Sequence, residues 1–359
     1  MSPLPKKAIL SINAYKPNFG VAKIKTQIRL SANENPLGCS PNINKNLKLQ
    51  DLNRYPPQNC ENLIKTISSI HNINKKQIIL SNGSDELISI ISQAYLNPGD
   101  EAIYTEFGFL QFPQSISVSG GTGKIAKDKN FRANVDNIIK LVSKKTRVIF
   151  LANANNPTGT FINRDEVYRL IENIPKHILI VYDAAYAEYI RDETYVDGKE
   201  LVKKFENVIM LRTFSKLHGL AALRLGWGYS SEKIVNYLMT VRGPFSVNSV
   251  AIQAGIIAME DLHFQDYCFN YNLESMKWIE NELNKINVFF QKSSANFFLM
   301  KLDKQNKSSA IELQKFFSSK GILVRNMNVY NLPEYIRVSL GTKVENRYFI
   351  EVLKKFISR

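Results

Sequence analysis

The chain has 359 residues, a mass of 41.0 kDa and a formal net charge of +15. This length exceeds what one ordinary hydrophobic core supports, so we expect two lobes, and the 44% hydrophobic and 22% charged residues exclude a disordered protein. The basic pairs, such as Lys75-Lys76 and Lys203-Lys204, are scattered along the chain, and we therefore expect no nucleic-acid partner.

The apolar segments and the cysteines indicate the compartment. No apolar run reaches the roughly 18 residues that span a bilayer, and the first residues carry no secretory signal, so we expect a cytoplasmic protein without a membrane partner. The cysteines Cys39, Cys60 and Cys268 are far apart, which fits free thiols in a reducing compartment. The histidines form no metal-binding motif, and we expect no metal.

Residues 72–229 alternate between short runs rich in Ile, Val and Leu and longer amphipathic segments. This alternation predicts an α/β fold in which helices cover both faces of a largely parallel sheet. The predicted strands are residues 78–80, 101–104, 147–152, 178–182, 208–212 and 225–229.

The two ends of the chain have a different pattern. The first part, before residue 53, is rich in Pro, Asn and Lys and weakly periodic, which predicts an arm that does not fold alone. After residue 261 a long helix, several short strands and two further helices predict a smaller α+β lobe. The sequence thus predicts an N-terminal arm with part of the small domain (1–50), a large domain (51–261) and a C-terminal small domain (262–359).

Polar motifs follow several of the predicted strands. The sequence SNGSDE at residues 81–86 opens a helix whose backbone N–H groups would attract an anion, although an ordinary capped helix start looks the same. The sequence NNPTG at residues 155–159 leaves the sheet sharply. Asp183 ends another apolar strand and needs a positive partner if it is buried, although it could instead cap a helix.

A lysine follows the strand at 208–212, within the sequence TFSK at residues 213–216, and Arg224 lies close behind it. Hydroxyl groups and an arginine around one lysine suit a phosphorylated ligand held beside an amine. Burial and neighbouring cations would lower the pKa of Lys216 and make it a nucleophile toward carbonyl groups. The alternative is a solvated surface lysine.

The order and spacing of these motifs resemble those of fold-type-I pyridoxal-phosphate aminotransferases over nearly the whole chain. Within that superfamily, SANENPLG at 31–38, RYP at 54–56, RGPFSVN at 242–248 and RVSLGT at 337–342 resemble the histidinol-phosphate aminotransferase family. The resemblance implies a large domain with a mostly parallel seven-stranded sheet flanked by helices, a smaller α+β domain, pyridoxal 5'-phosphate as the cofactor and a homodimer with shared active sites.

The resemblance also implies roles for individual residues. Lys216 would bind the cofactor covalently and move protons, Asp183 would pair with the ring nitrogen, and Asn156 and Tyr186 would contact the phenolic oxygen. Phe109 would stack on the ring, although an ordinary core phenylalanine is the alternative. The cofactor phosphate would be held by Ser84, Asp85, Thr213, Ser215 and Arg224, together with Tyr55 of the partner subunit.

For the substrates, the resemblance implies amino transfer between L-histidinol phosphate and 2-oxoglutarate, which gives imidazole acetol phosphate and glutamate. Arg337 and Arg325 would bind the substrate anion, and Tyr15 and Asn33 from the arm would help to close the site. An aromatic or broad-specificity aminotransferase and a phosphothreonine decarboxylase share the cofactor residues, so both stay open. A regulatory or binding protein that keeps this fold without catalysis is a further alternative.

Three positions depart from the usual pattern of the family. Ala154 stands where a proline often precedes the two asparagines, and Phe107 and Phe112 replace more polar residues. These changes bear on loop shape and substrate contacts and leave the cofactor residues intact.

Overall fold

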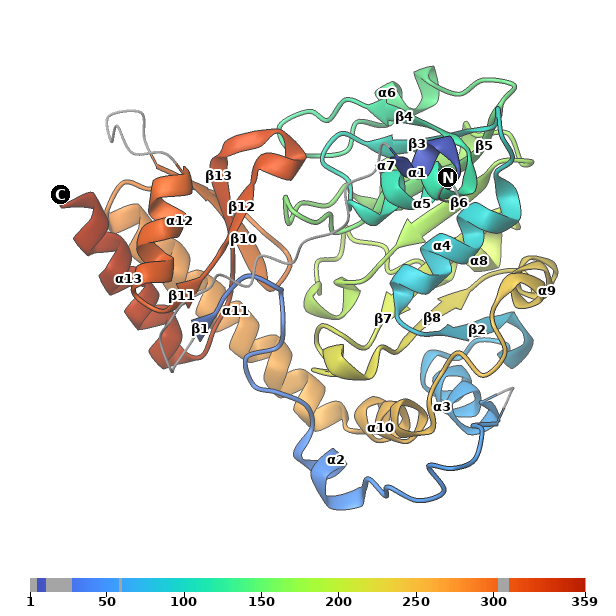
Figure 1. Ribbon diagram of the computed structural model, residues 1–359, viewed down its shortest axis with the longest axis horizontal. Coiled ribbons are helices and arrows are strands. Elements are labelled where there is room, and N and C mark those ends of the chain that lie inside the picture. The colour runs from blue at the N-terminus through green and yellow to red at the C-terminus, as the bar shows by residue number, and fades with distance from the viewer. Residues whose placement is uncertain (1–4, 11–27, 58–59, 303–309, 359) are drawn as a thin grey trace, which may run out of the picture.

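The computed structural model describes residues 5–10, 28–57, 60–302 and 310–358. Tyr15, predicted to help close the site, lies outside these residues. The chain forms a large lobe and a small lobe, and the long helix α11 (Leu262–Lys285) runs from one to the other (Figure 1).

A seven-stranded sheet forms the centre of the large lobe, in the order β2-β8-β7-β6-β5-β3-β4. Neighbouring strands are parallel except at β8, which runs antiparallel to both β2 and β7. This sheet confirms the predicted architecture, and one strand, β4, was missed because its residues are mostly exposed at the sheet edge. The strands are β2 (Ile78–Ser81), β3 (Glu101–Thr105), β4 (Thr122–Ala126), β5 (Thr146–Ala152), β6 (Leu179–Asp183), β7 (Val208–Thr213) and β8 (Gly226–Tyr229).

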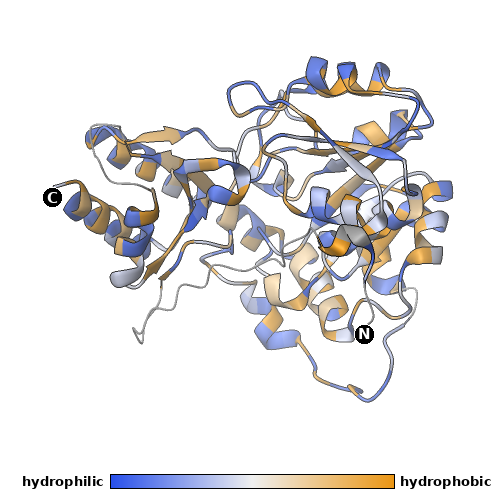
Figure 2. Ribbon diagram, turned by 45° about the horizontal axis from the view of Figure 1, so that its top comes forward, coloured by the Kyte–Doolittle hydropathy of each residue, from blue (hydrophilic) through white to orange (hydrophobic). Residues whose placement is uncertain are grey.

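Alternate residues along these strands enter two different hydrophobic cores. Leu151 and Tyr182 face one core, whereas Phe150 and Val181 face the other. The first face is covered by α3 (Glu61–His71), α6 (Val135–Lys140), α7 (Arg164–Glu172), α8 (Lys199–Lys204) and α10 (Ser249–Glu260), and the second by α4 (Ser84–Tyr95), α5 (Gln111–Ser119) and α9 (Glu232–Val241). Figure 2 shows that the helices carry both apolar and polar residues, as expected for elements with one buried side.

The small lobe is built on an antiparallel four-stranded sheet in the order β12-β13-β10-β9, with a separate hydrophobic core. Its strands are β9 (Phe289–Gln291), β10 (Phe297–Lys301), β12 (Arg325–Met327) and β13 (Leu332–Ser339), and helices α11, α12 (Ala310–Ser319) and α13 (Lys343–Ile357) pack against them.

The N-terminal segments contact both lobes. Strand β1 (Ile28–Arg29) pairs with β11 (Ile322–Leu323) of the small lobe, whereas α2 (Pro41–Asn46) places Ile43 in the core of the large lobe. The short helix α1 (Lys7–Leu10) contacts α5. The domain boundaries at residues 50 and 261 stay a prediction.

Within the described ranges, no helix is both long and apolar enough to cross a membrane. Over the same residues, no group of three His, Cys, Asp or Glu side chains is arranged to hold a metal ion. The cysteines Cys39, Cys60 and Cys268 are free thiols.

Candidate active site

Three neighbouring strands end side by side at one edge of the large sheet. The register pairs Ala152 of β5 with Asp183 of β6, and Asp183 with Leu211 of β7. Because side chains alternate along a strand, Asp183 and Thr213 point to the same face as Val181 and Leu211, which is the face covered by α4. Ligands of α/β proteins bind at such carboxyl ends of parallel strands.

A cavity lies at this edge, next to the start of α4. It brings together residues that the sequence assigned to the cofactor, namely Ser84, Asp85, Phe109, Asn156, Asp183, Tyr186, Thr213, Ser215, Lys216 and Arg224. The alanines Ala152, Ala154 and Ala185 complete the lining and were not predicted to do so. Their small side chains leave room for a ligand, and no motif marks them because alanine is common in any core.

Asp183 is an almost fully buried carboxylate, 5% exposed, whose Oδ1 accepts a hydrogen bond of 3.1 Å from the backbone N–H of Ala185. Burial raises its pKa to about 7, and the carboxylate of Asp85 adds to the shift. The nearest short helix begins only at Ala187, after Tyr186, so Asp183 does not cap it. A buried carboxylate of this kind is stabilised by a cation in the cavity.

Lys216 lies in the cavity and not on a solvated surface. Its Nζ donates a hydrogen bond of 3.4 Å to the carbonyl oxygen of Ala32. Burial and then the charges of Arg337 and Arg224 lower its pKa to about 8. The amine is therefore partly neutral near physiological pH, which both nucleophilic attack and proton transfer require.

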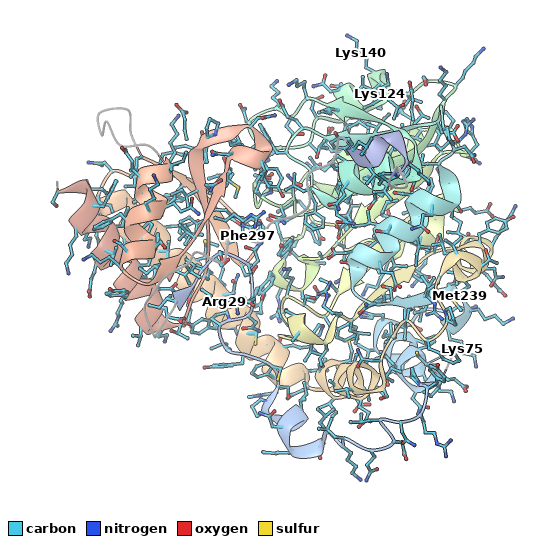
Figure 3. The ribbon with its side chains drawn as sticks, viewed as in Figure 1. Arg29, Lys75, Lys124, Lys140, Met239 and Phe297 are labelled. Carbon is cyan, nitrogen blue, oxygen red and sulfur yellow. The ribbon has the colours of Figure 1, made fainter. Side chains whose placement is uncertain are left out.

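Tyr186 connects the two lobes beside Lys216. Its hydroxyl accepts a hydrogen bond of 2.9 Å from Nδ2 of Asn33, and its ring packs edge-on against Phe297 at 5.3 Å between centroids. Figure 3 labels Phe297 on β10, where the small lobe meets the large one. Burial raises the pKa of Tyr186, so its hydroxyl stays protonated and can donate a hydrogen bond.

The end of the cavity at Arg224 and the start of α4 carries the groups expected around a phosphate. Arg224 Nη1 donates to Oγ of Ser215 at 3.2 Å, and Arg224 Nη2 lies 3.3 Å from Oδ2 of Asp85. A Cβ atom at Gly83 would lie only 2.4 Å from Arg224 Nη2, and the φ of +82° at Gly83 also favours glycine. Helix α4 begins at Ser84, and its first N–H groups have no partner within the helix.

These residues fit pyridoxal phosphate, the group that the resemblance implies. Asp183 would pair with a protonated ring nitrogen, Lys216 would reach the aldehyde carbon, and Asn156 and Tyr186 would contact the phenolic oxygen. The phosphate would take the end formed by Arg224 and α4.

The small lobe supplies the two arginines predicted to bind the substrate. Arg325 of β12 and Arg337 of β13 lie directly opposite each other in register and are 9% and 6% exposed. Arg337 donates to the side-chain oxygen of Asn156 and, at 2.7 Å, to the carbonyl oxygen of Ser31. Asn33 of the N-terminal arm, which was also predicted to lie at the site, donates a hydrogen bond to the Tyr186 hydroxyl.

Tyr55 is not brought to the cavity of its own chain. Its side chain is 81% exposed and stacks on Phe245 at 4.7 Å between ring centroids. Phe109, by contrast, lines the cavity and packs edge-on against Phe112. The structure therefore gathers the predicted cofactor residues with the exception of Tyr55.

The chain is similar to known proteins over nearly its whole length. Residues 25–353 match the family of class I and II aminotransferases. The chain is 39% identical over 355 residues to the histidinol-phosphate aminotransferase of Pelagibacter ubique (strain HTCC1062), with 98% of each chain covered. It is 36% identical to the histidinol-phosphate aminotransferase of Maricaulis maris (strain MCS10), also with 98% of each covered.

Solved structures agree in fold. The histidinol-phosphate aminotransferase of Sinorhizobium meliloti, in complex with pyridoxal-5'-phosphate, gives a TM-score of 0.91 at 22% identity and covers 98% of this chain and 97% of its own. A tetra mutant of Thermus thermophilus aspartate aminotransferase gives 0.84 at 15% identity, with 99% and 100% covered. The predicted fold-type-I architecture is confirmed. By its full-length similarity, the chain belongs to the class I and II aminotransferases and, among them, to the histidinol-phosphate aminotransferase family.

Proposed function

We propose that the protein transfers the amino group of L-histidinol phosphate to 2-oxoglutarate, with pyridoxal phosphate as its cofactor. The observation that carries the proposal is the identity of 39% and 36%, over nearly full length, to two histidinol-phosphate aminotransferases. The cavity supports it independently, because the lysine, the buried carboxylate and the phosphate end needed for such a cofactor all line one space.

The arginines of the small lobe support an anionic substrate. Arg325 and Arg337 occupy opposite positions of an antiparallel strand pair, so two buried guanidinium groups lie close together. The guanidinium fork suits a phosphate as well as a carboxylate. The same pair would thus receive the phosphate of histidinol phosphate in one half of the cycle and a carboxylate of 2-oxoglutarate in the other.

Lys216 and the side chains around it have different roles in the proposed reaction. When bound, pyridoxal phosphate supplies an electron sink that stabilises negative charge at the substrate Cα. Lys216 Nζ, whose pKa is lowered to about 8, would take the proton from the substrate Cα and deliver it to the C4′ carbon of the cofactor. Asp183 would hold a positive charge on the ring nitrogen, and the hydrogen bond from Asn33 holds the Tyr186 hydroxyl in place.

The exposed position of Tyr55 supports a homodimer with shared sites. Leu49, Leu52 and Tyr55 are 67%, 64% and 81% exposed, which is unusual for large apolar side chains so close in sequence. Covering them with a second copy of the chain would bury this surface. It would also bring Tyr55 of the partner subunit to the cofactor phosphate.

We further propose that the protein works in the cytoplasm. The three free thiols fit a reducing compartment, since a cell keeps such cysteines unpaired there. Biosynthetic activity on phosphorylated small molecules also fits that location.

A substrate panel tests the proposed function. The protein loaded with pyridoxal phosphate is incubated with 2-oxoglutarate and, separately, histidinol phosphate, phenylalanine, tyrosine, aspartate or O-phosphothreonine, and glutamate and carbon dioxide are measured. We expect the highest kcat/KM for glutamate formation with histidinol phosphate. A higher kcat/KM with an aromatic amino acid, or release of carbon dioxide from O-phosphothreonine, would contradict the proposal.

A further inference from the structure

The strand ends that carry the active site have a second, rear face. Thr213 points into the cavity, and Arg212, the residue before it on β7, points to the opposite face because side chains alternate. Tyr182 stands in the same relation to Asp183 on β6. Arg212 is 4% exposed and Tyr182 is fully buried, so a charged group lies behind the site, inside the protein.

Arg212 is held there by two carboxylates. Its Nη1 donates to Oε1 of Glu188 at 2.8 Å, and its Nη2 lies 3.5 Å from Oδ2 of Asp197. Nη2 also donates to the carbonyl oxygen of Asp197 at 3.0 Å. Glu188 is itself mostly buried, with a side chain 16% exposed, so this ion pair is screened little by solvent.

A single segment, residues 192–198, joins the rear of three strands, and we call it the rear strap. The hydroxyl of Tyr195 donates to the carbonyl oxygen of Asn153, just past the end of β5, at 2.8 Å. On β6, the hydroxyl of Tyr182 donates to the carbonyl oxygen of Val196. On β7, Arg212 bonds the strap at Asp197. The strap therefore holds together the strands whose front faces line the cavity.

We propose that Arg212, through its ion pair with Glu188 and its bond to the rear strap, is a positioning residue that sets the distance between Lys216 and the Asp183–Tyr186 turn. Glu188 follows Tyr186 by two residues, and Arg212 directly precedes Thr213. The pair thus connects the backbone carrying Lys216 with the backbone carrying Asp183 and Tyr186. Neither Arg212 nor Glu188 lines the cavity.

The chemistry of the guanidinium explains why an arginine stands here. Its planar fork donates in fixed directions to Glu188 and to Asp197 at once, so it restrains two segments in relation to β7. A misplacement of about 1 Å between reacting groups costs about 100-fold in rate. A loose connection behind the strands would therefore alter the reaction without removing any group that touches it.

The experiment separates positioning from stability, and it rests on the proposed use of pyridoxal phosphate. Three variants are compared with the unaltered chain: Arg212→Met, Glu188→Met and the double variant. Arg212→Met leaves Glu188 without its partner, and Glu188→Met leaves Arg212 with only one of its two carboxylates, so each single change should lower Tm. The double change removes both charges, and Asp197 keeps its partner Lys199 at 3.0 Å, so Tm should recover.

Two readouts report on positioning. The first is the pH midpoint of the visible absorption band of the cofactor-loaded protein, measured without substrate. We expect it to rise by about 0.5 to 1 pH unit in all three variants, as a weakened hydrogen bond at Tyr186 predicts. The second is kcat, which should fall by about 10- to 100-fold with a smaller change in KM. Neither should recover in the double variant.

The exposed ion pair of Arg164 and Glu200, 3.5 Å apart with side chains 45% and 49% exposed, provides the matched control. Arg164→Met should leave Tm, midpoint and kcat unchanged. Recovery of the midpoint and kcat together with Tm in the double variant would show that Arg212 only stabilises the fold. If the Met variants do not fold, the same measurements are made on Glu188→Gln. An unchanged pH midpoint of the absorption band in this variant would contradict the inference.

Failure of this inference and failure of the proposed function look different. The absorption midpoint needs no substrate, so a wrong choice of substrate leaves it intact. An unaltered chain that binds no pyridoxal phosphate would contradict the proposed function and this inference with it. A normal band in the unaltered chain, with the same midpoint in every variant, would contradict this inference alone.

Discussion

The cofactor pocket and the substrate side of the active site are built in different ways. Among the residues that the structure describes, every side chain that lines the cavity belongs to the large lobe. Arg325 and Arg337 belong to the small-lobe sheet, and Arg337 reaches the cavity by its hydrogen bond to Asn156. The register of one sheet therefore positions the chemistry, whereas recognition depends on how two lobes meet.

The two regions also differ in what holds them. The cavity residues are held by backbone hydrogen bonds between β5, β6 and β7. These bonds pair Ala152 with Asp183, and Asp183 with Leu211. The substrate side rests on individual side-chain bonds, such as Asn33 to Tyr186 at 2.9 Å and Asn296 to the carbonyl oxygen of Asn33 at 3.1 Å. Substitutions in the first region should therefore abolish the chemistry, and those in the second should mainly weaken substrate binding.

The largest effect is expected from Lys216→Ala. Loss of the amine removes both the covalent attachment and the proton carrier, so turnover should fall by at least about 10³-fold. Borohydride reduction of the unaltered protein, followed by peptide mapping, should label Lys216, and the variant should take up no stable label. Lys140→Ala, an exposed lysine on α6, is the control and should behave normally. Stable labelling at another lysine would contradict the proposal that Lys216 binds the cofactor covalently.

Asp183→Ala should have the next largest effect. Without the carboxylate the ring nitrogen loses its charged partner, and kcat should fall by about 10²- to 10³-fold, as for loss of one buried electrostatic contact at a reacting centre. Steady-state kinetics with a fixed cofactor concentration measures it. A near-normal kcat would mean that Asp183 only accepts the Ala185 N–H bond seen in the structure.

Arg337→Lys tests the other side of the comparison. Lysine keeps the charge and loses the fork, so kcat/KM should fall by about 10- to 100-fold. The absorption spectrum of the bound cofactor should change little, because the cavity lining is intact. Arg347→Lys on the exposed side of α13 is the matched control. Loss of cofactor binding in Arg337→Lys would show that the two regions are not separable.

The stability of the cofactor-free protein should depend on pH through Asp183. Its pKa is raised from 3.8 to about 7 in the folded chain, so the folded state binds this proton more tightly than the unfolded state does. Stability should therefore fall as pH rises from about 4 to 7. Asp183→Asn should be more stable than the unaltered chain at pH 8, by on the order of 1–4 kcal/mol. Urea unfolding at pH 5 and pH 8 measures the difference, and an equal pH slope in both proteins would contradict it.

The smallest effect is expected from Tyr55→Phe. If Tyr55 of the partner subunit contacts the cofactor phosphate as proposed, the change removes one hydroxyl donor, so cofactor affinity should weaken by about 2- to 10-fold. Equilibrium dialysis at several protein concentrations measures it, because the proposed contact would exist only in a dimer. Unchanged affinity at every concentration would leave Tyr55 as a surface residue stacked on Phe245.

A subunit-exchange experiment sharpens the same point. Tyr55→Asp, whose carboxylate would repel the phosphate, is mixed with Lys216→Ala. If the sites are shared, hybrid dimers contain one site with both residues intact, and activity should partly return. Hybrids that form without regaining activity would contradict the shared site and leave the chemistry at Lys216 untouched.

The placement of the cavity residues was predictable because its signals are local. Asp183, Lys216 and Arg224 each follow an apolar strand closely in the sequence, and the carboxyl ends of parallel strands meet at one edge whatever the details of packing. The edge strand Thr122–Ala126 was not predictable in this way, because an exposed strand lacks a continuous apolar run.

The pairing of distant residues was decided by the tertiary structure alone. Arg212 meets Glu188 across 24 positions, and Arg337 meets Asn156 across 181, and no spacing rule in the sequence joins either pair. The order of strands in the sheet sets the first contact and the approach of the two lobes sets the second. The sequence by itself determined which groups stand at the strand ends. Their distances apart follow from packing, because burial leaves each charged side chain few places where a partner can satisfy it.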